Sequence, residues 1–389
     1  MAENTATRKI RHRGRFEQIG IYLVKFMRLF VYQNDWKVLP MSIVIAGLVS
    51  LVVRRDFFVT MEGTLKGALA LSCIAIWNGF FNSIQVVCRE REIIKREHRS
   101  GLHISSYIVS HMLYQALLCL IQTVLTIYTC KSMGIKFPTE GLFTSWMMLD
   151  VGITVFLISY SADMISLWIS TLVHNTTTAM SIMPFILIAQ LVFSGGIFQL
   201  PAWSDGISKL MISHYGVRCI AAQADYNNRP MVTAWNTLVK MENNDIEVAY
   251  TLDELMVMLK DDQEDAAVKL LSADGVGQKI VEILKGKNVD REVIINAIID
   301  VIKSDPRYEE IKDKKFTIFK VKIKDVIDAI GREKVRDYLQ YKTAQVTQNP
   351  DYAMTESNIL SMWLAFVAFI VLFSSLSIVC LEFIDKDKR

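Results

Sequence analysis

Long apolar runs alternate with charged segments along most of the chain. Most runs are close to the length of about 20 residues that a helix needs to cross a bilayer, although the first is rather short and the fourth is too long for one untilted span. Apolar runs of this length predict a mainly α protein with a six-helix transmembrane bundle. The six expected spans are 38–53, 67–88, 104–129, 142–173, 179–198 and 359–383.

The stretch before the first span has a different pattern. In residues 16–35 apolar side chains recur every three or four positions, and Glu17, Lys25 and Arg28 interrupt them. This periodicity is typical of an amphipathic helix that lies in the membrane interface. We therefore assign residues 1–35 to a cytoplasmic tail followed by an interfacial connecting helix.

The most highly charged short segment, residues 89–101, separates the second span from the third. A charged segment between two spans must lie in water on one side of the bilayer. Opposite charges recur at helical spacing along it, and Gly101 is placed to end a helix. One interpretation is a short helix that contacts a partner in the cytoplasm, and the other is a solvated loop.

Residues 199–222 are half polar and contain Pro201, so we expect a re-entrant or interfacial segment there. With this segment, residues 36–222 form spans one to five. Residues 356–389 form the sixth span and a basic tail.

Residues 223–355 are polar and predict a large, mostly helical extracytoplasmic domain between spans five and six. Thr251 and Glu254 form a capping-box pattern, and residues 316–323 alternate as in a strand. Further helices are expected at 279–284, 293–302 and 325–339.

Charge and composition predict the orientation of the chain in the membrane and its cellular location. Lys and Arg are concentrated in the first 15 residues, in 89–101 and after 385, which predicts a multi-pass protein with both termini in the cytoplasm. No signal peptide is evident. The six cysteines fall mostly within apolar runs, and the outer domain has none. We expect a bacterial inner (plasma) membrane protein without disulfides or a metal site.

No motif for nucleotide binding or hydrolysis is present. The chain has no Gly-x-x-x-x-Gly-Lys-Ser/Thr, no His-Glu-x-x-His and no Gly-x-Ser-x-Gly. We expect no catalytic residue and no cofactor in this chain.

The two acids of the fourth span, Asp150 and Asp163, are thirteen residues apart and lie on different helix faces, which disfavours an aspartyl protease. Asp163 shares a face with Ser159, Ser166 and Ser170. We interpret this face as a polar packing seam, with a proton relay as the alternative.

A second polar stripe runs along the second span. Asn78, Asn82 and Gln85 recur at helical spacing, with Phe81 beside them. These residues indicate either hydrogen bonding between helices or a pathway for an amphipathic substrate.

Two separated motifs resemble one known family. Residues 91–97, Gly101 and Ser105-Ser106-Tyr107 are similar to the coupling helix and the start of the third span in the G subfamily of ABC transporters and its bacterial relatives. Phe193-Ser194-Gly195-Gly196, Leu200-Pro201-x-Trp203 and Ser213-His214-Tyr215 resemble the segment after that family's fifth span.

The resemblance implies the permease subunit of an ABC exporter. A second copy of the chain, or a related permease, would complete the pore. ATP and Mg²⁺ would bind to a separate ATPase chain. The residues it assigns are Arg91, Glu92, Arg96 and Glu97 for coupling, Asn78, Phe81, Asn82, Phe185 and Gln190 for the substrate pathway, and Gly195, Gly196, Pro201 and Trp203 for the outer gate.

The outer domain is larger than in that family, and the ATPase domain is missing. We therefore expect an amphipathic, lipid-like or peptide-like substrate rather than one taken from its relatives. Membrane lipid is an expected partner, and nucleic acid is not. The alternative function is a membrane-anchored receptor or binding protein that acts through its outer domain.

Overall fold

The computed structural model describes residues 14–196, 201–251, 308–313, 315–346 and 348–383, with six more single positions or pairs between 253 and 306. The chain divides into two compact units. One comprises Met1–Ala234 with Tyr338–Arg389, and the other is Trp235–Asp337.

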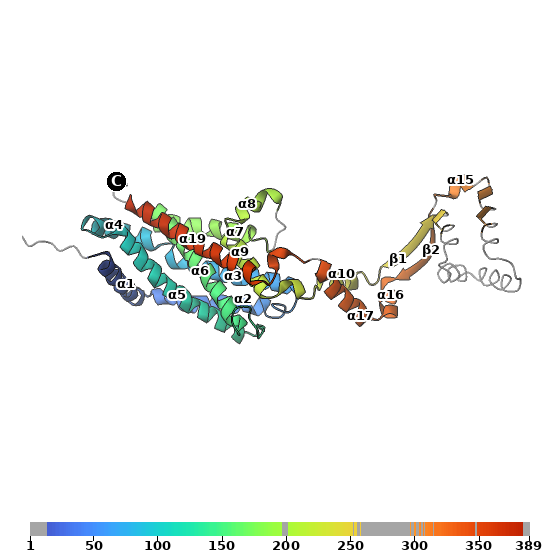
Figure 1. Cartoon of the computed structure of the whole chain (residues 1–389), viewed down its shortest axis with the longest axis horizontal. Helices are drawn as coiled ribbons and strands as arrows, with labels where there is room; N and C mark the ends of the chain where they lie inside the picture. The colour runs from blue at the N-terminus through green and yellow to red at the C-terminus, as the bar shows by residue number, and fades with distance from the viewer. Residues whose placement is uncertain are drawn as a thin grey trace, which may run out of the picture. The chain divides into compact units, whose positions relative to one another are not determined.

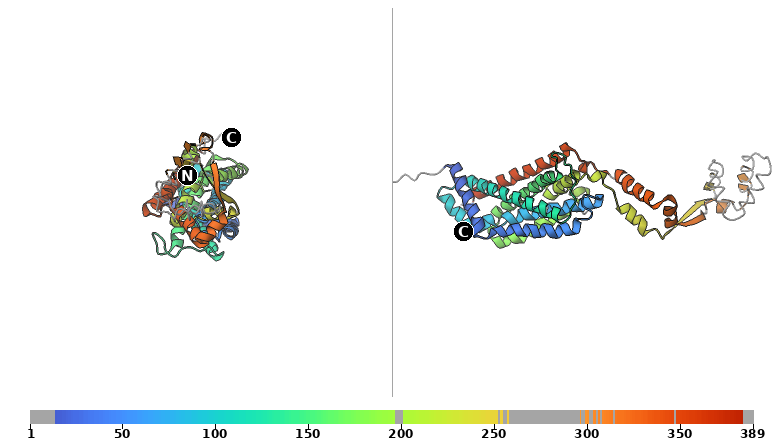
Figure 2. Two further views of the ribbon diagram at one scale, coloured as in Figure 1. Left: turned by 90° about the vertical axis from the view of Figure 1, so that its right-hand side faces the viewer. Right: turned by 90° about the horizontal axis from the view of Figure 1, so that it is seen from below.

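The first unit is a helical bundle whose long helices run roughly side by side (Figures 1 and 2). Its long elements are α1 (Arg15–Tyr32), α2 (Val38–Val53), α3 (Met61–Ser83), α4 (Val86–Arg99), α5 (Ile104–Ser132), α6 (Met147–Leu172), α7 (Thr176–Val192), α9 (Ile212–Gln223) and α19 (Glu356–Glu382). Shorter elements are η1 (Asp35–Lys37), η2 (Ala202–Ser204), α8 (Asp205–Ser208), η3 (Tyr226–Asn228), η4 (Tyr338–Lys342), α18 (Thr343–Val346) and η5 (Pro350–Tyr352).

Five helical stretches of the described chain are long and apolar enough to cross a membrane: Asp35–Val53, Met61–Arg99, Ile104–Ser132, Met147–Leu172 and Glu356–Glu382. The apolar helix α7, with 17 residues, falls just short of this length. The chain is therefore a mostly helical, multi-pass membrane protein, and the count of six spans stays a prediction.

Several boundaries differ from those expected. The predicted second span, 67–88, ends early, because α3 stops at Ser83 and α4 begins at Val86. The predicted fourth span, 142–173, is shortened at its start. The carboxylate of Asp150 accepts hydrogen bonds from the backbone N–H groups of Phe143 (3.0 Å) and Thr144 (3.2 Å), which holds the preceding residues in a loop.

The segment after α7 is more deeply buried than an interfacial position implies. Helix α9 packs against α3, α6, α7 and α19, and ten of its twelve residues are buried. Its small residues permit this close packing, since a Cβ at Gly216 would lie 2.9 Å from the Ser72 hydroxyl oxygen. Twelve residues are too few to cross the bilayer, so the description as re-entrant still fits the length of α9.

The centre of the bundle is the contact between α3 and α6. Gly79 of α3 lies against the backbone of Ser159, and a Cβ there would also come within 2.9 Å of the Ala162 Cβ. Helix α6 additionally contacts α4, α5, α9 and α19. A glycine at this crossing lets two backbones approach closely, as is common in membrane helix pairs.

The second unit contains a two-stranded antiparallel sheet of β1 (Asp245–Thr251) and β2 (Lys315–Lys322). The residue pairs run from Asp245 with Lys322 to Thr251 with Lys315, with an irregularity at Val248/Ala249. Among its described residues, the helices are α10 (Thr233–Lys240), which begins in the first unit, α15 (Tyr308–Ile311), α16 (Ile323–Ile330) and α17 (Arg332–Asp337).

The sequence predicted β2 to within one residue but missed its partner β1. The predicted helix 325–339 is broken, because Gly331 adopts a φ of 103° between α16 and α17. Thr251 and Glu254 form the predicted capping box, since the Thr251 N–H donates to Glu254 (2.9 Å) and the Glu254 N–H donates to the Thr251 hydroxyl (3.3 Å). The predicted helices 279–284 and 293–302, and the basic tail, lie wholly or largely outside the described residues.

Replacing Gly79 with Ala should destabilise the bundle by about 1–3 kcal/mol, because the added methyl group overpacks the α3–α6 contact. Gly152→Ala, on the open side of α6 where no atom lies within 4 Å of a built Cβ, is the matched control. Thermal unfolding of the purified proteins measures the difference. Equal midpoints for the two variants would contradict the close packing.

Deleting residues 235–337 should leave the bundle inserted in the membrane. The Met231 N–H donates to the Gln340 carbonyl oxygen (2.9 Å), so the two cut ends already lie close together within the first unit. We expect the unfolding midpoint of the bundle to change by less than about 4 °C, the equivalent of roughly 1 kcal/mol. Loss of the truncated chain from the membrane fraction would contradict this division into units.

Candidate functional site

Helix α4 has one buried face and one exposed, charged face. Val87, Cys88, Glu90 and Ile94 are buried, whereas Glu92, Ile93, Arg96 and Arg99 are exposed. Gly101 takes a φ of 108° after the helix, which confirms its predicted role as a helix stop. The segment 89–101 is therefore a packed helix and its terminal turn rather than a solvated loop.

The first turn of α4 is bonded to the end of α6. The Ser170 hydroxyl oxygen accepts hydrogen bonds from the backbone N–H groups of Val87 (3.1 Å) and Cys88 (3.2 Å). Arg91 donates to the carbonyl oxygen of Thr171 (2.9 Å). Its positive charge also interacts favourably with the negative, C-terminal end of the α6 dipole. The start of α4 and the end of α6 thus form one joint.

The last turn of α4 is bonded to α1. The Lys25 ammonium lies 3.4 Å from Glu97 and 3.8 Å from Glu90, and the Tyr22 hydroxyl donates to Glu97 (2.9 Å). Burial, and then the hydrogen bond to Glu97, raise the pKa of Tyr22, so its hydroxyl stays a donor at neutral pH. Gln18 reaches the turn after α4, donating to the Gly101 carbonyl (3.1 Å) and accepting from the His103 N–H (3.0 Å).

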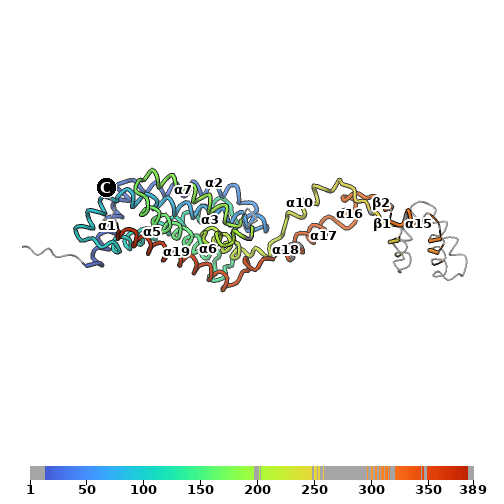
Figure 3. The backbone as a smooth tube through the Cα atoms, turned by 90° about the horizontal axis from the view of Figure 1, so that it is seen from above, coloured from blue at the N-terminus to red at the C-terminus, as the bar shows by residue number. Residues whose placement is uncertain are grey.

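Aromatic side chains join α1 to α5 beside these polar contacts. Phe26 is buried and meets Tyr107 and His111 edge to face, with ring centroids 5.5 Å and 5.3 Å apart. Tyr107 also meets Tyr22 edge to face at 5.7 Å. Edge-to-face pairs of this kind add to the stabilisation from burial. Helices α1 and α4 lie at the same end of the bundle as the last turn of α19 (Figures 1 and 3).

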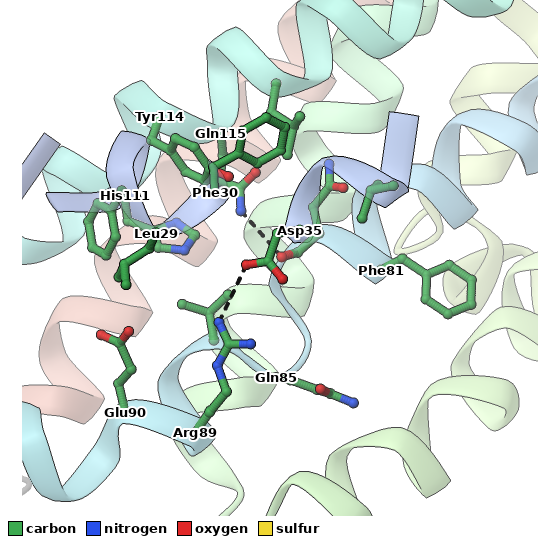
Figure 4. Close-up of a pocket in the computed structure, with 15 residues that line it drawn as sticks. Leu29, Phe30, Asp35, Phe81, Gln85, Arg89, Glu90, His111, Tyr114 and Gln115 are labelled. Atoms are coloured by element: carbon green, nitrogen blue, oxygen red, sulfur yellow. Dashed lines mark hydrogen bonds and ion pairs between the residues drawn. The ribbon is translucent and has the colours of Figure 1, made fainter. Parts of the chain in front are cut away.

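A small cavity of about 120 Å³ lies between α1, η1, α3, α4 and α5. An ion pair joins two of its lining residues, Arg89 and Asp35, at 3.7 Å (Figure 4). The deeper lining includes Glu90, His111 and Gln115.

Both asparagines of the predicted substrate pathway are engaged between helices. Asn78 of α3 is buried and donates to the Ser42 hydroxyl of α2 (3.0 Å). Asn82 forms a reciprocal amide pair with Gln122 of α5, at 2.8 Å and 3.1 Å. These contacts favour the interpretation of the stripe as hydrogen bonding between helices.

The other predicted pathway residues divide into buried and exposed groups. Gln190 is buried and accepts from the Ser213 N–H (3.0 Å), which ties α7 to α9. Phe185 is 74% exposed and Phe81 is 40% exposed. On the same two helices Trp77 and Ile188 are also exposed. The exposed residues, rather than the amides, are accessible to a substrate or to another chain.

The predicted gate residues lie in the turn after α7 and in the segment before α8. Gly195 adopts a φ of 75°, and Gly196 is buried with its built Cβ 3.3 Å from Leu69. Trp203 is 73% exposed. Pro201 accepts the Ser204 hydroxyl and N–H through its carbonyl oxygen, whereas Leu200 lies outside the described residues.

The α6 seam is buried as predicted. The Ser166 hydroxyl donates to the Phe80 carbonyl of α3 (2.9 Å), and the Ser170 hydroxyl accepts from the Val87 N–H of α4. Two residues of the seam thus form hydrogen bonds with neighbouring helices. Asp163 and Ser159 are fully or almost fully buried at the α3 crossing.

The sequence analysis missed the residues that connect α1 to α4. Gln18, Tyr22 and Lys25 recur at spacings of four and three, which places them on one face of the connecting helix. This spacing is the feature of the sequence that could have identified them as one contact surface. Glu97, the partner of Tyr22 and Lys25, could be identified only from the structure, since these contacts span more than 70 residues.

The comparisons with known proteins agree with the bundle. A family model described as ABC-2 type transporter matches residues 18–223, from α1 to the end of α9. No curated protein matches the chain. Because the match covers more than half of the sequence, the chain belongs to the ABC-2 type transporter family, and its bundle is a permease domain of ABC transporters.

Proposed function

We propose that this chain is the permease subunit of an ABC exporter and that a separate ATPase chain drives it. The observation that carries the proposal is the position of α4. Its buried side is bonded to α6 at one end and to α1 at the other, while Glu92 and Arg96 are exposed on its outer side. A partner that binds this outer side would move α1, α4 and α6 together.

In this proposal the chain performs no covalent chemistry. ATP and Mg²⁺ bind to the partner, and closure of the ATPase displaces α4. The exposed ends of Glu92 and Arg96 supply charged contacts, whereas Arg91 and Glu97 transmit the movement through their bonds to α6 and α1. Charge-assisted hydrogen bonds suit such a joint, because they are shorter and stronger than neutral ones.

Two copies of the chain would enclose the substrate pathway. The exposed aromatic and aliphatic side chains of α3 and α7, namely Trp77, Phe81, Phe185 and Ile188, provide an apolar surface for the second copy and for an amphipathic substrate. Gly195, Gly196, Pro201 and Trp203 would form the outer gate. The glycine-containing turn at 195–196 provides the backbone freedom that a gate needs.

The proposed location is the inner (plasma) membrane, with both termini in the cytoplasm. The excess of Lys and Arg in α4 and in the terminal segments supports this orientation. In the proposed orientation, the unit Trp235–Asp337 is the extracytoplasmic part of the chain. There it is available to receive the exported substrate or to bind a partner.

A membrane-anchored receptor is the second candidate function. The observation in its favour is that Trp235–Asp337 forms a compact unit with its own sheet and cross-strand ion pairs, such as Lys320 with Asp245 (3.2 Å) and Glu247 (3.0 Å). A receptor would not require an ATPase, and this difference separates the two functions.

Reversing the charge of Lys25 should uncouple ATP hydrolysis from transport. Lys25→Glu places a third carboxylate beside Glu90 and Glu97 at the α1–α4 contact, and we expect the stimulation of the partner ATPase by substrate to fall at least about fivefold. The Lys25→Glu/Glu97→Lys double variant restores opposite charges and should recover most of the coupling. ATPase activity of the reconstituted complex measures both.

Arg28→Glu is the matched control for this charge reversal. Arg28 is exposed on the same helix and pairs with no carboxylate among the described residues. It should keep its coupling. Equal losses in Lys25→Glu and Arg28→Glu, or no recovery in the double variant, would contradict a role of this ion pair in transmission.

Asn82→Leu tests whether the α3 stripe packs or contacts substrate. It leaves the Gln122 amide without its partner, so we expect a loss of about 0.5–2 kcal/mol in stability. The Asn82→Leu/Gln122→Leu double variant should recover part of this loss. A normal unfolding midpoint together with altered substrate-stimulated ATPase activity would instead assign Asn82 to the pathway.

A further inference from the structure

The cavity between α1, η1, α3, α4 and α5 has a lining that none of the contacts above explains. Three polar atoms of its lining residues have no hydrogen-bond partner in the described structure: Glu90 Oε2, Gln115 Oε1 and His111 Nδ1. The three residues are only 7%, 1% and 1% exposed. A buried polar atom that lacks a partner is costly, so the lining suits a bound group that supplies hydrogen bonds.

The unpaired atoms define what this ligand must supply. A carboxylate oxygen and an amide oxygen can only accept hydrogen bonds, and one imidazole tautomer also presents Nδ1 as an acceptor. The Gln115 amide nitrogen is already used, since it donates to the Ser83 hydroxyl (3.0 Å) and the Asn82 carbonyl (3.3 Å). The ligand therefore carries several N–H or O–H donors in one small group.

The charges of the lining favour a cation over a neutral donor. The nearest cation to Glu90 is Lys25, whose Nζ is 3.8 Å away and beyond hydrogen-bond distance. Arg89 forms an ion pair of similar length with Asp35 (3.7 Å), so neither cation donates a hydrogen bond to Glu90. Figure 4 shows the carboxylates of Glu90 and Asp35 and the ring of His111 around the same space. The rings of Phe26, Phe30 and Tyr114 complete a wall that suits a positive charge.

A metal ion fits this lining less well than an organic cation. Among the described residues, no group of three or more His, Cys, Asp and Glu side chains is arranged to hold a metal. The cavity, of about 120 Å³, has room for a small organic group.

We propose that this cavity binds a primary ammonium group, with Glu90 as its counter-ion and Gln115 and His111 as further hydrogen-bond acceptors. The ammonium group belongs either to the headgroup of an aminophospholipid or to a small soluble amine. Once bound, it bridges α1, α4 and α5. The binding does not depend on the proposed transport function and is measured without an ATPase.

The test uses the full chain in nanodiscs, with the unfolding midpoint as the readout. Phosphatidylcholine alone is the reference, since its quaternary headgroup has no N–H donor. Adding phosphatidylethanolamine, or adding ethanolamine to the buffer, should raise the midpoint by a few degrees, because a ligand that binds only the folded state stabilises it. A rise with the lipid alone identifies the headgroup as the source, and a rise with ethanolamine alone identifies a soluble amine. A rise with neither means that water fills the cavity and overturns the proposal.

Glu90→Gln separates this site from a general effect of the bilayer. The variant keeps the size of the side chain and removes its charge, so the amine-dependent rise should disappear and affinity should fall about tenfold or more. Glu17→Gln, an exposed acid of α1 outside this cavity, is the matched control and should keep the rise.

Gln115→Met removes the amide oxygen and provides a second, independent variant if Glu90→Gln does not fold. Retention of the full rise in the folded variants would place the amine elsewhere and overturn the proposal.

Discussion

The bundle depends on pairing polar groups within the protein, since the hydrocarbon core of a bilayer offers them no partner. Its helices are joined by such pairs: Asn82 with Gln122, Gln190 with Ser213, and Ser166 with the Phe80 carbonyl. Close backbone approach at Gly79 makes the central crossing of α3 and α6 possible. Polar residues along the spans are in this sense the structural framework of the permease domain.

The same constraint explains why α4 is suited to transmit movement. It is the polar continuation of α3, and hydrogen bonds and ion pairs join its inner side to two other helices, α6 and α1. Ser170 and the Thr171 carbonyl hold its first turn to α6, and Tyr22 and Lys25 hold its last turn to α1. A displacement of α4 therefore also moves α1 and α6. The cavity beside it adds a third connection, to α5, wherever a ligand fills it.

The sequence predicted the features that depend on local patterns. Apolar runs located the long helices, Gly101 marked the end of α4, and the capping box at Thr251 and the strand β2 were found from short motifs. These features depend on side chains within a few residues of each other, and hydropathy and capping rules describe such neighbours well.

Features that depend on distant partners were not predictable in the same way. Helix α9 is buried because it packs on four other helices. Asp150 holds the preceding loop because the backbone around Phe143 folds back and donates a hydrogen bond to its carboxylate. The sequence of one helix does not show whether Asn82 pairs with Gln122 on another helix or faces a substrate pathway. For the candidate site, the sequence indicated α4 and its charges but not the α1 residues that bind it.

The central claim is that this chain works with an ATPase bound at α4. Affinity purification of the full chain from its native membrane in mild detergent, with identification of the proteins that accompany it, tests this claim most directly. We expect a stoichiometric ATPase with a phosphate-binding loop, and its loss when Glu92 and Arg96 are reversed in charge. Purification without any ATPase, and with a different protein held by the unit Trp235–Asp337, would contradict the claim and favour the receptor.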